Sequence, residues 1–126
     1  MKTNEILVVD DDIISQNMLR TTLSGAGYSV IIAYTGMEAI KLARERLPNL
    51  IVLDIMMPDV DGGEVAEILR KDPKTMAIPI IFLSSLVLEK EERTHGNKDI
   101  VSFFAKPYNR EKLLNEIRKH LYKDNP

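Results

Sequence analysis

The chain has 126 residues, 44% of them hydrophobic, and a formal net charge of −2. This length suits one globular domain with its own core, and we expect residues 1–126 to form it. The absence of cysteine excludes disulfides, thiolate metal sites and thiol catalysis. The near balance of 17 basic and 19 acidic residues argues against direct binding of nucleic acid. No apolar run approaches membrane-spanning length, so we expect a cytoplasmic protein without membrane contact.

The first apolar run, residues 6–9, predicts a buried strand that ends in three aspartates at 10–12. Asp12 suits the N-cap of a following helix, because its side chain can accept from amides of the first turn. That helix ends at the Gly-rich stretch 25–27, since glycine commonly follows the last helical turn. Its apolar stripe is predicted to contain Ile14, Met18, Leu19 and Leu23.

Residues 28–33 predict a second strand, followed by a helix that Thr35 caps and Pro48 stops. The inward face of this helix is expected to carry Ala39, Ile40, Ala43 and Leu47. The third apolar run, 50–53, ends on Asp54, and a loop rich in Pro, Asp and Gly follows it. A run buried on both faces can present a polar group only at its carboxyl end, so Asp54 should lie at the mouth of a crevice.

A short helix after this loop should bury Val65, Ile68 and Leu69. Two more apolar runs, 78–83 and 101–105, end in Ser84 and Lys106. A last helix should start near Asn109 and leave a frayed tail at 123–126. Between the last two strands, residues 86–99 predict only a short, weakly packed helix, because their centre is all charged.

Strands and helices therefore alternate five times, which predicts parallel βαβ units with helices on both faces of one sheet. We expect an α/β three-layer sandwich. In a parallel sheet all the carboxyl ends of the strands lie on one edge. That edge should bring together five polar residues: Asp10, Asp11, Asp54, Ser84 and Lys106.

Polar residues at the ends of strands are often only turn formers, but this combination suggests phosphoryl chemistry. Clustered carboxylates repel one another unless a cation joins them, and Mg²⁺ prefers carboxylate and phosphate oxygens. Lys106 can balance the charge of an anion, and Ser84 can donate to one of its oxygens. Asp54 is then placed to form an aspartyl-phosphate, a known class of carboxylate nucleophile.

Four motifs carry a family resemblance: I-L-V-V-D-D at 6–11, D-I-M-M-P-D-V-D-G at 54–62, P-I-I-F-L-S-S at 79–85, and K-P at 106–107. In order and spacing they resemble the CheY-like receiver domain of two-component response regulators. The resemblance covers essentially the whole chain. It implies a flavodoxin-like (βα)5 fold with the sheet order 2-1-3-4-5.

The resemblance also implies roles in a phosphorelay. Asp54 would take a phosphoryl group from a sensor histidine kinase or a phosphotransfer protein, and the change would pass to a downstream partner or output domain. It allows a homodimer that forms on phosphorylation. Mg²⁺ would be bound by Asp10, Asp11, Asp54 and the backbone carbonyl of Met56. Ser84 and Lys106 would contact the phosphoryl oxygens, and Ser84 and Phe103 would form the conformational switch.

Two alternatives remain open: an interaction module with the same fold that signals without phosphorylation, and a phosphotransferase or phosphatase that uses Asp54 on a separate substrate. The intact polar set disfavours the first, and the lack of residues for a substrate domain disfavours the second, so we do not expect an enzyme. Met56 and Leu86, each two residues beyond a site residue, are apolar. They should shield an acyl phosphate, which predicts slow hydrolysis.

Overall fold

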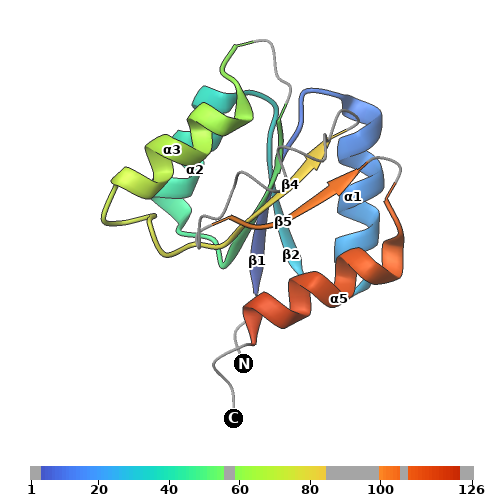
Figure 1. The fold of residues 1–126 in the computed structure, drawn as a ribbon. Coiled ribbons are helices and arrows are strands. Elements are labelled where there is room, and N and C mark those ends of the chain that lie inside the picture. Colours follow the sequence, from blue (N-terminus) through green and yellow to red (C-terminus); the bar gives the residue numbers. More distant parts are fainter. Residues whose placement is uncertain (1–3, 56–58, 85–99, 106–107, 123–126) are drawn as a thin grey trace.

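The computed structural model describes residues 4–55, 59–84, 100–105 and 108–122. Within them, five parallel strands form one sheet in the order β2-β1-β3-β4-β5 (Figure 1). The predicted strand order is therefore confirmed. The weak helix predicted within 86–99 and the tail at 123–126 lie outside the described residues.

Strands and helices alternate along the described chain, except between the last two strands. The strands are β1 (Glu5–Val9), β2 (Ser29–Ala33), β3 (Leu50–Asp54), β4 (Ile80–Ser84) and β5 (Ile100–Ala105). The helices are α1 (Ile13–Gly25), α2 (Gly36–Arg46), α3 (Gly62–Lys71) and α5 (Arg110–Leu121). None of the helices in these described ranges is long and apolar enough to cross a membrane.

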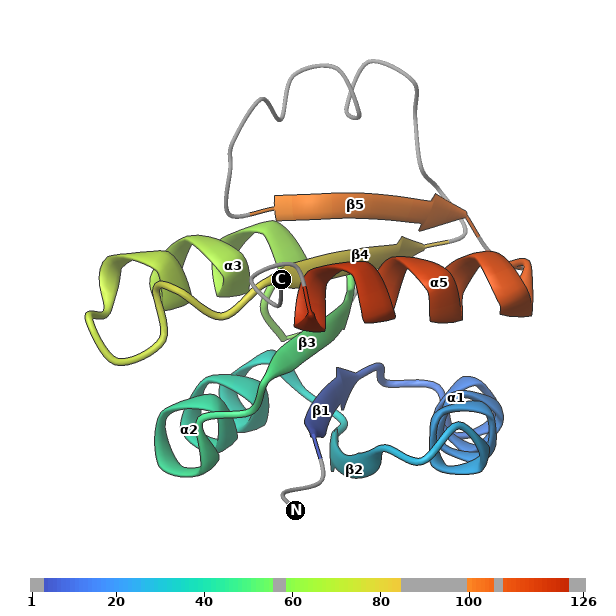
Figure 2. The same ribbon diagram turned by 90° about the horizontal axis from the view of Figure 1, so that it is seen from below.

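The sheet lies between two helical layers, with α2 and α3 on one face and α1 and α5 on the other (Figure 2). Successive side chains of a strand point to opposite faces. In β1, Leu7 and Val9 accordingly pack on the α2–α3 side, whereas Ile6 and Val8 pack on the α1–α5 side. The central strands are covered on both faces, which explains their unbroken apolar runs.

The helices bury different side chains on the two faces of the sheet. On the α2–α3 side, α2 contributes the small residues Ala39 and Ala43, whereas α3 contributes Val65, Ala66 and Leu69. On the opposite side, α1 and α5 contribute large ones: Leu19, Leu23, Leu113 and Ile117.

The helices begin where local sequence predicts. Asp12 Oδ2 accepts the Ser15 N–H at 3.0 Å, and Thr35 Oγ1 accepts the Glu38 N–H at 3.1 Å. Asn109 caps α5 in the same way. Each side chain satisfies an amide of the first turn that has no partner within the helix. The predicted caps and the predicted start of α5 are therefore confirmed.

The predicted stripe of α1 is partly wrong. Ile14 is 69% exposed and Met18 is exposed as well. The buried face carries Gln16, Leu19 and Leu23, spaced at i, i+3 and i+7. The sequence pattern selected apolar residues, but the geometry of the helix places a polar one on the inner face.

Two inward residues predicted for the other helical layer are also exposed, Leu47 and Ile68. Leu47 follows the last turn of α2 with a left-handed φ of 48°, so it ends the helix instead of packing beneath it. On α3, Val65, Ala66 and Leu69 form the buried face. Ile68 lies outside that arc of the helix.

Candidate functional site

Asp54 is the last residue of β3, the central strand of the sheet. In the register of the sheet, β3 pairs with β1 on one side and with β4 on the other. Asp54 is only 8% exposed although it is charged. The prediction that Asp54 lies at the carboxyl end of a buried strand is confirmed, and the crevice expected there stays a prediction.

Three carboxylates meet at this edge. Asp10 directly follows β1, is 1% exposed, and lies next to the exposed Asp11. Carboxylate oxygens of Asp10, Asp11 and Asp54, one from each residue, lie within 4.8 Å of one another. Like charges this close repel one another, and a hard divalent cation with oxygen ligands removes that conflict. The donor set therefore fits Mg²⁺.

The loop that carries Asp10 and Asp11 is held from inside the protein. Asp10 Oδ1 accepts the Asp12 N–H at 2.9 Å, which folds the loop into a tight turn. Beneath it, Gln16 Nε2 donates to the carbonyl oxygens of Asp10, Val8 and Ala33 at 3.0, 3.1 and 2.7 Å. The Gln16 amide thus joins the carboxyl ends of β1 and β2 to α1.

Sequence reasoning missed Gln16. The signal was present, since Gln16 precedes Leu19 and Leu23 at helical spacing. A polar residue in a buried helical row should have been assigned to a buried hydrogen bond. Its Oε1 has no hydrogen-bond partner among the described residues.

The loop after Asp54 returns close to the end of β3. The Gly62 N–H donates to the Ile55 carbonyl oxygen at 2.8 Å, which closes the loop between them. A Cβ added at Gly62 would lie 2.4 Å from the carbonyl oxygen of Asp54 and 2.7 Å from Cα of Ile55. Only glycine fits this position, because both obstacles are backbone atoms.

The other predicted site residues are placed only in part. Ser84 is the last residue of β4, and its backbone pairs with Ala105 at the end of β5. The strand ends that carry Ser84 and precede Lys106 therefore lie on the same edge as Asp54. The side chains of Ser84 and Phe103, and all of Met56 and Lys106, lie outside the described residues.

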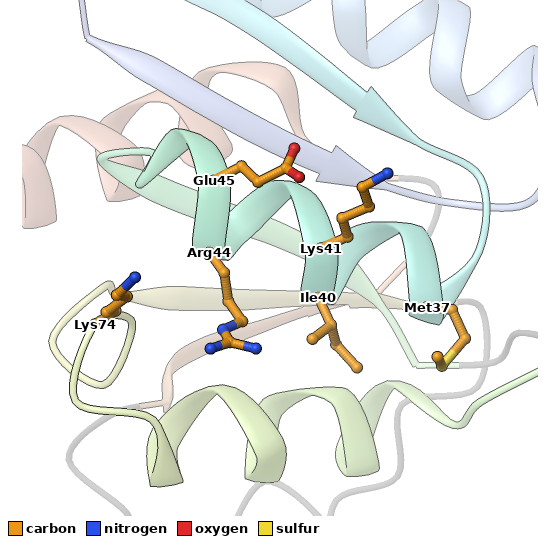
Figure 3. Close-up of a pocket in the computed structure, with 6 residues that line it drawn as sticks. All are labelled: Met37, Ile40, Lys41, Arg44, Glu45 and Lys74. Atoms are coloured by element: carbon orange, nitrogen blue, oxygen red, sulfur yellow. The ribbon is translucent and has the colours of Figure 1, made fainter.

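A groove of about 610 Å³ lies along α2 (Figure 3). It is lined by Met37, Ile40, Lys41, Arg44, Glu45 and Lys74. Arg44 Nε pairs with Asp72 Oδ2 at 2.7 Å. None of the three clustered aspartates lines this groove.

Comparison with known proteins agrees with this geometry. The response regulator receiver domain model matches residues 6–118. The polar-differentiation response regulator DivK of Brucella ovis is 29% identical over 119 residues, covering 94% of this chain and 97% of DivK. A probable transcriptional regulator of Porphyra purpurea, ycf29, is 34% identical over 119 residues. That match covers 94% of this chain but only 57% of the relative's length.

Among solved structures, chemotaxis protein CheY4 of Vibrio cholerae superposes with a TM-score of 0.86 at 28% identity. The match covers 94% of this chain and 98% of CheY4. The motifs, the strand order, the acidic cluster and the family model thus agree over nearly the whole chain. The chain belongs to the response regulator receiver domain family.

Proposed function

We propose that Asp54 is the phosphoacceptor of this receiver domain and that residues 1–126 act as one signalling unit. The observation that carries the proposal is the convergence of the Asp10, Asp11 and Asp54 carboxylate oxygens within 4.8 Å at the carboxyl edge of the sheet. Asp54 lies on a central strand whose apolar residues are buried, so its position is fixed before a donor arrives. Preorganisation of this kind favours group transfer.

The proposed metal ligands are Asp10, Asp11, Asp54 and the backbone carbonyl of Met56. Mg²⁺ bound there supplies positive charge that offsets the carboxylates and the incoming phosphoryl oxygens. An oxygen of Asp54 forms the new bond to phosphorus while the bond from phosphorus to the donor's imidazole nitrogen breaks. The electron pair of that bond stays on the nitrogen. Ser84 and Lys106 are assigned to the phosphoryl oxygens, and Ser84 with Phe103 to the switch.

The phosphodonor is a sensor histidine kinase or a phosphotransfer protein, and the signal leaves through a protein partner or an output domain. A homodimer formed on phosphorylation is one such output. The exposed apolar residues Ile13, Ile14 and Met18 lie on α1 directly after the acidic turn. Such a surface beside the acceptor suits contact with the donor protein. We place this activity in the cytoplasm, with no separate substrate turned over.

The experiment is intact-mass measurement after incubation with acetyl phosphate and Mg²⁺. Wild type should gain one phosphoryl group, EDTA should prevent the gain, and Asp54→Asn should lack it. Asp72→Asn is the matched control, because Asp72 pairs with Arg44 and is no part of the acidic cluster. Equal gain in Asp54→Asn would exclude Asp54 as the acceptor.

The same experiment separates the alternatives. A wild-type chain that takes no phosphoryl group from acetyl phosphate or from a histidine donor would favour the phosphorylation-independent interaction module. Continued Mg²⁺-dependent release of phosphate from an added phosphate ester would favour an enzyme. Timing the decay of the phosphorylated protein tests the predicted slow hydrolysis, and a half-life of seconds would contradict the shielding assigned to Met56 and Leu86.

A further inference from the structure

The loop after Asp54 makes a contact with another helix through Asp59. Asp59 Oδ1 accepts the Gly36 N–H at 3.0 Å, and Oδ2 accepts the Met37 N–H at 3.2 Å. Gly36 and Met37 are the first two residues of α2, more than twenty positions earlier in the chain. The Asp59 carboxylate therefore joins the loop after Asp54, which precedes α3, to the start of α2.

The amides that Asp59 accepts are the ones that the local sequence of α2 leaves unsatisfied. Thr35 Oγ1 accepts the Glu38 N–H, and the Thr35 carbonyl accepts the Ala39 N–H. These local acceptors cover the third and fourth amides of the helix. The first two amides point to Asp59, whose negative charge also suits the positive end of the helix dipole.

Close backbone packing accompanies these hydrogen bonds. A Cβ added at Gly36 would lie 2.8 Å from Cβ of Val60 and 3.0 Å from Cγ2 of Val65. Glycine at position 36 therefore lets Val60, the residue after Asp59, lie directly against α2. At the other end of the loop, Gly62 lies against the backbone of Asp54.

The charge state of Asp59 supports the same arrangement. The hydrogen bond from the Gly36 amide, aided by the one from Met37, holds the pKa of Asp59 below its usual value. The carboxylate therefore stays ionised at neutral pH and keeps both acceptor oxygens. The β3–α3 loop is thus held at two points, by Gly62 at the end of β3 and by Asp59 at the start of α2.

We infer that Asp59 is a positioning residue for the phosphorylation of Asp54, an inference that rests on the proposed function. Met56, whose carbonyl is a proposed metal ligand, lies in sequence between Ile55, which accepts the Gly62 N–H, and Asp59. Gly62 packs against the backbone of Asp54 and Ile55, and Asp59 bonds the start of α2, so both contacts limit movement of the backbone beside the acceptor. Precise placement of reacting groups sets the rate of group transfer. Asp59 touches neither the donor nor the metal in this role.

The test compares two acceptors at the same helix terminus. Asp59→Ala removes the acceptor that comes from the loop after Asp54, whereas Thr35→Ala removes one that belongs to α2 itself. Both variants should lower the melting temperature by weakening α2. Only Asp59→Ala should also slow phosphorylation by acetyl phosphate about tenfold and weaken Mg²⁺ binding, measured by intact mass and by calorimetry. Asp59→Asn, which keeps one acceptor oxygen, should lie between Asp59→Ala and wild type.

The outcomes are distinct. If Asp59→Ala and Thr35→Ala lose stability together and both keep rates within about twofold of wild type, Asp59 is only a helix cap and the inference is wrong. If Asp59→Ala does not fold, the stability and phosphorylation rate of Asp59→Asn are compared with those of Thr35→Ala instead. If wild type takes no phosphoryl group, the proposed function fails, and the Mg²⁺ affinities of the two variants then decide the inference. A wild-type chain that also binds no Mg²⁺ would overturn both.

Discussion

The two loops next to the clustered carboxylates are held in opposite ways. The loop after β1, with Asp10 and Asp11, is tied from inside by Gln16, which is fully buried and donates to three carbonyl oxygens. The loop after β3, which follows Asp54, is tied from outside by the exposed Asp59. One anchor is an amide in the core, and the other is a carboxylate in water.

The two anchors should have different effects, one on the stability of the fold and the other on the geometry of the site. Water cannot replace the buried Gln16 amide, so its loss removes a buried donor from the carbonyls of Val8 and Asp10, while the Ala33 carbonyl keeps the Asp10 N–H. Water can replace an exposed carboxylate as an acceptor, but it cannot join a loop to a helix. The inner anchor should therefore govern the free energy of unfolding, and the outer anchor should govern the geometry of the site.

The largest effect is expected from Gly62→Ala, which disturbs the loop after β3 at the point where it packs against Asp54. The new Cβ would lie 2.4 Å from the Asp54 carbonyl oxygen, and backbone atoms cannot move aside cheaply. We expect a loss of about 3 kcal/mol or more in the free energy of unfolding, measured in urea. Gly25→Ala is the control, since nothing lies within 4 Å of its added Cβ. Equal stability of the two variants would contradict the close packing of this loop.

Gln16→Leu tests the inner anchor. It removes the donor to the carbonyls of Val8, Asp10 and Ala33, at a cost of about 2 kcal/mol in the free energy of unfolding. The cost is moderated because the substitution also removes Oε1, which is buried without a partner in the described part of the chain. Asn17→Leu, at an exposed neighbouring position, should change stability by less than about 0.5 kcal/mol. Similar values for both variants would remove the contrast between the two anchors.

The outer anchor should respond to pH in a defined direction. The amides of Gly36 and Met37 hold the pKa of Asp59 below its usual value. A lowered pKa in the folded state contributes stability above the unfolded pKa, and that contribution is lost as pH falls through the folded one. The difference in melting temperature between wild type and Asp59→Asn should therefore be constant near neutral pH and shrink as pH falls below about 4. A difference that does not change with pH would show that the carboxylate charge contributes nothing.

Local sequence patterns predicted much of this molecule. The five strands are apolar runs, four of which lead directly into polar residues, and Asp12 and Thr35 are caps followed by a helical pattern, so each could be assigned from its neighbours. Asp10, Asp11 and Asp54 could be brought together because parallel strands share one edge. The sequence also suggested the family, which supplied the strand order.

What sequence reasoning missed depends on contacts between distant segments. Asp59 was assigned only to the loop after Asp54, since nothing near it in sequence indicates that its partners are Gly36 and Met37. Gln16 was passed over because apolar residues were favoured for the buried face of α1. The roles of Ser84, Phe103, Lys106 and Met56 remain predictions, because those side chains or residues lie outside the described part of the chain.

The smallest change in stability is expected at the C-terminal end of α2. It separates the contribution of the Asp59 contact from the stability of the helix as a whole. Leu47 ends the helix at φ 48°, a conformation that costs an L-residue energy and glycine little. Leu47→Gly keeps the N–H that bonds the Ala43 carbonyl and should raise the free energy of unfolding by less than about 1 kcal/mol. It makes α2 more stable without touching its first turn, so Mg²⁺ affinity and phosphorylation rate should stay at wild-type values. If they rise with stability, the order of α2 as a whole, not the tie through Asp59, controls the loop.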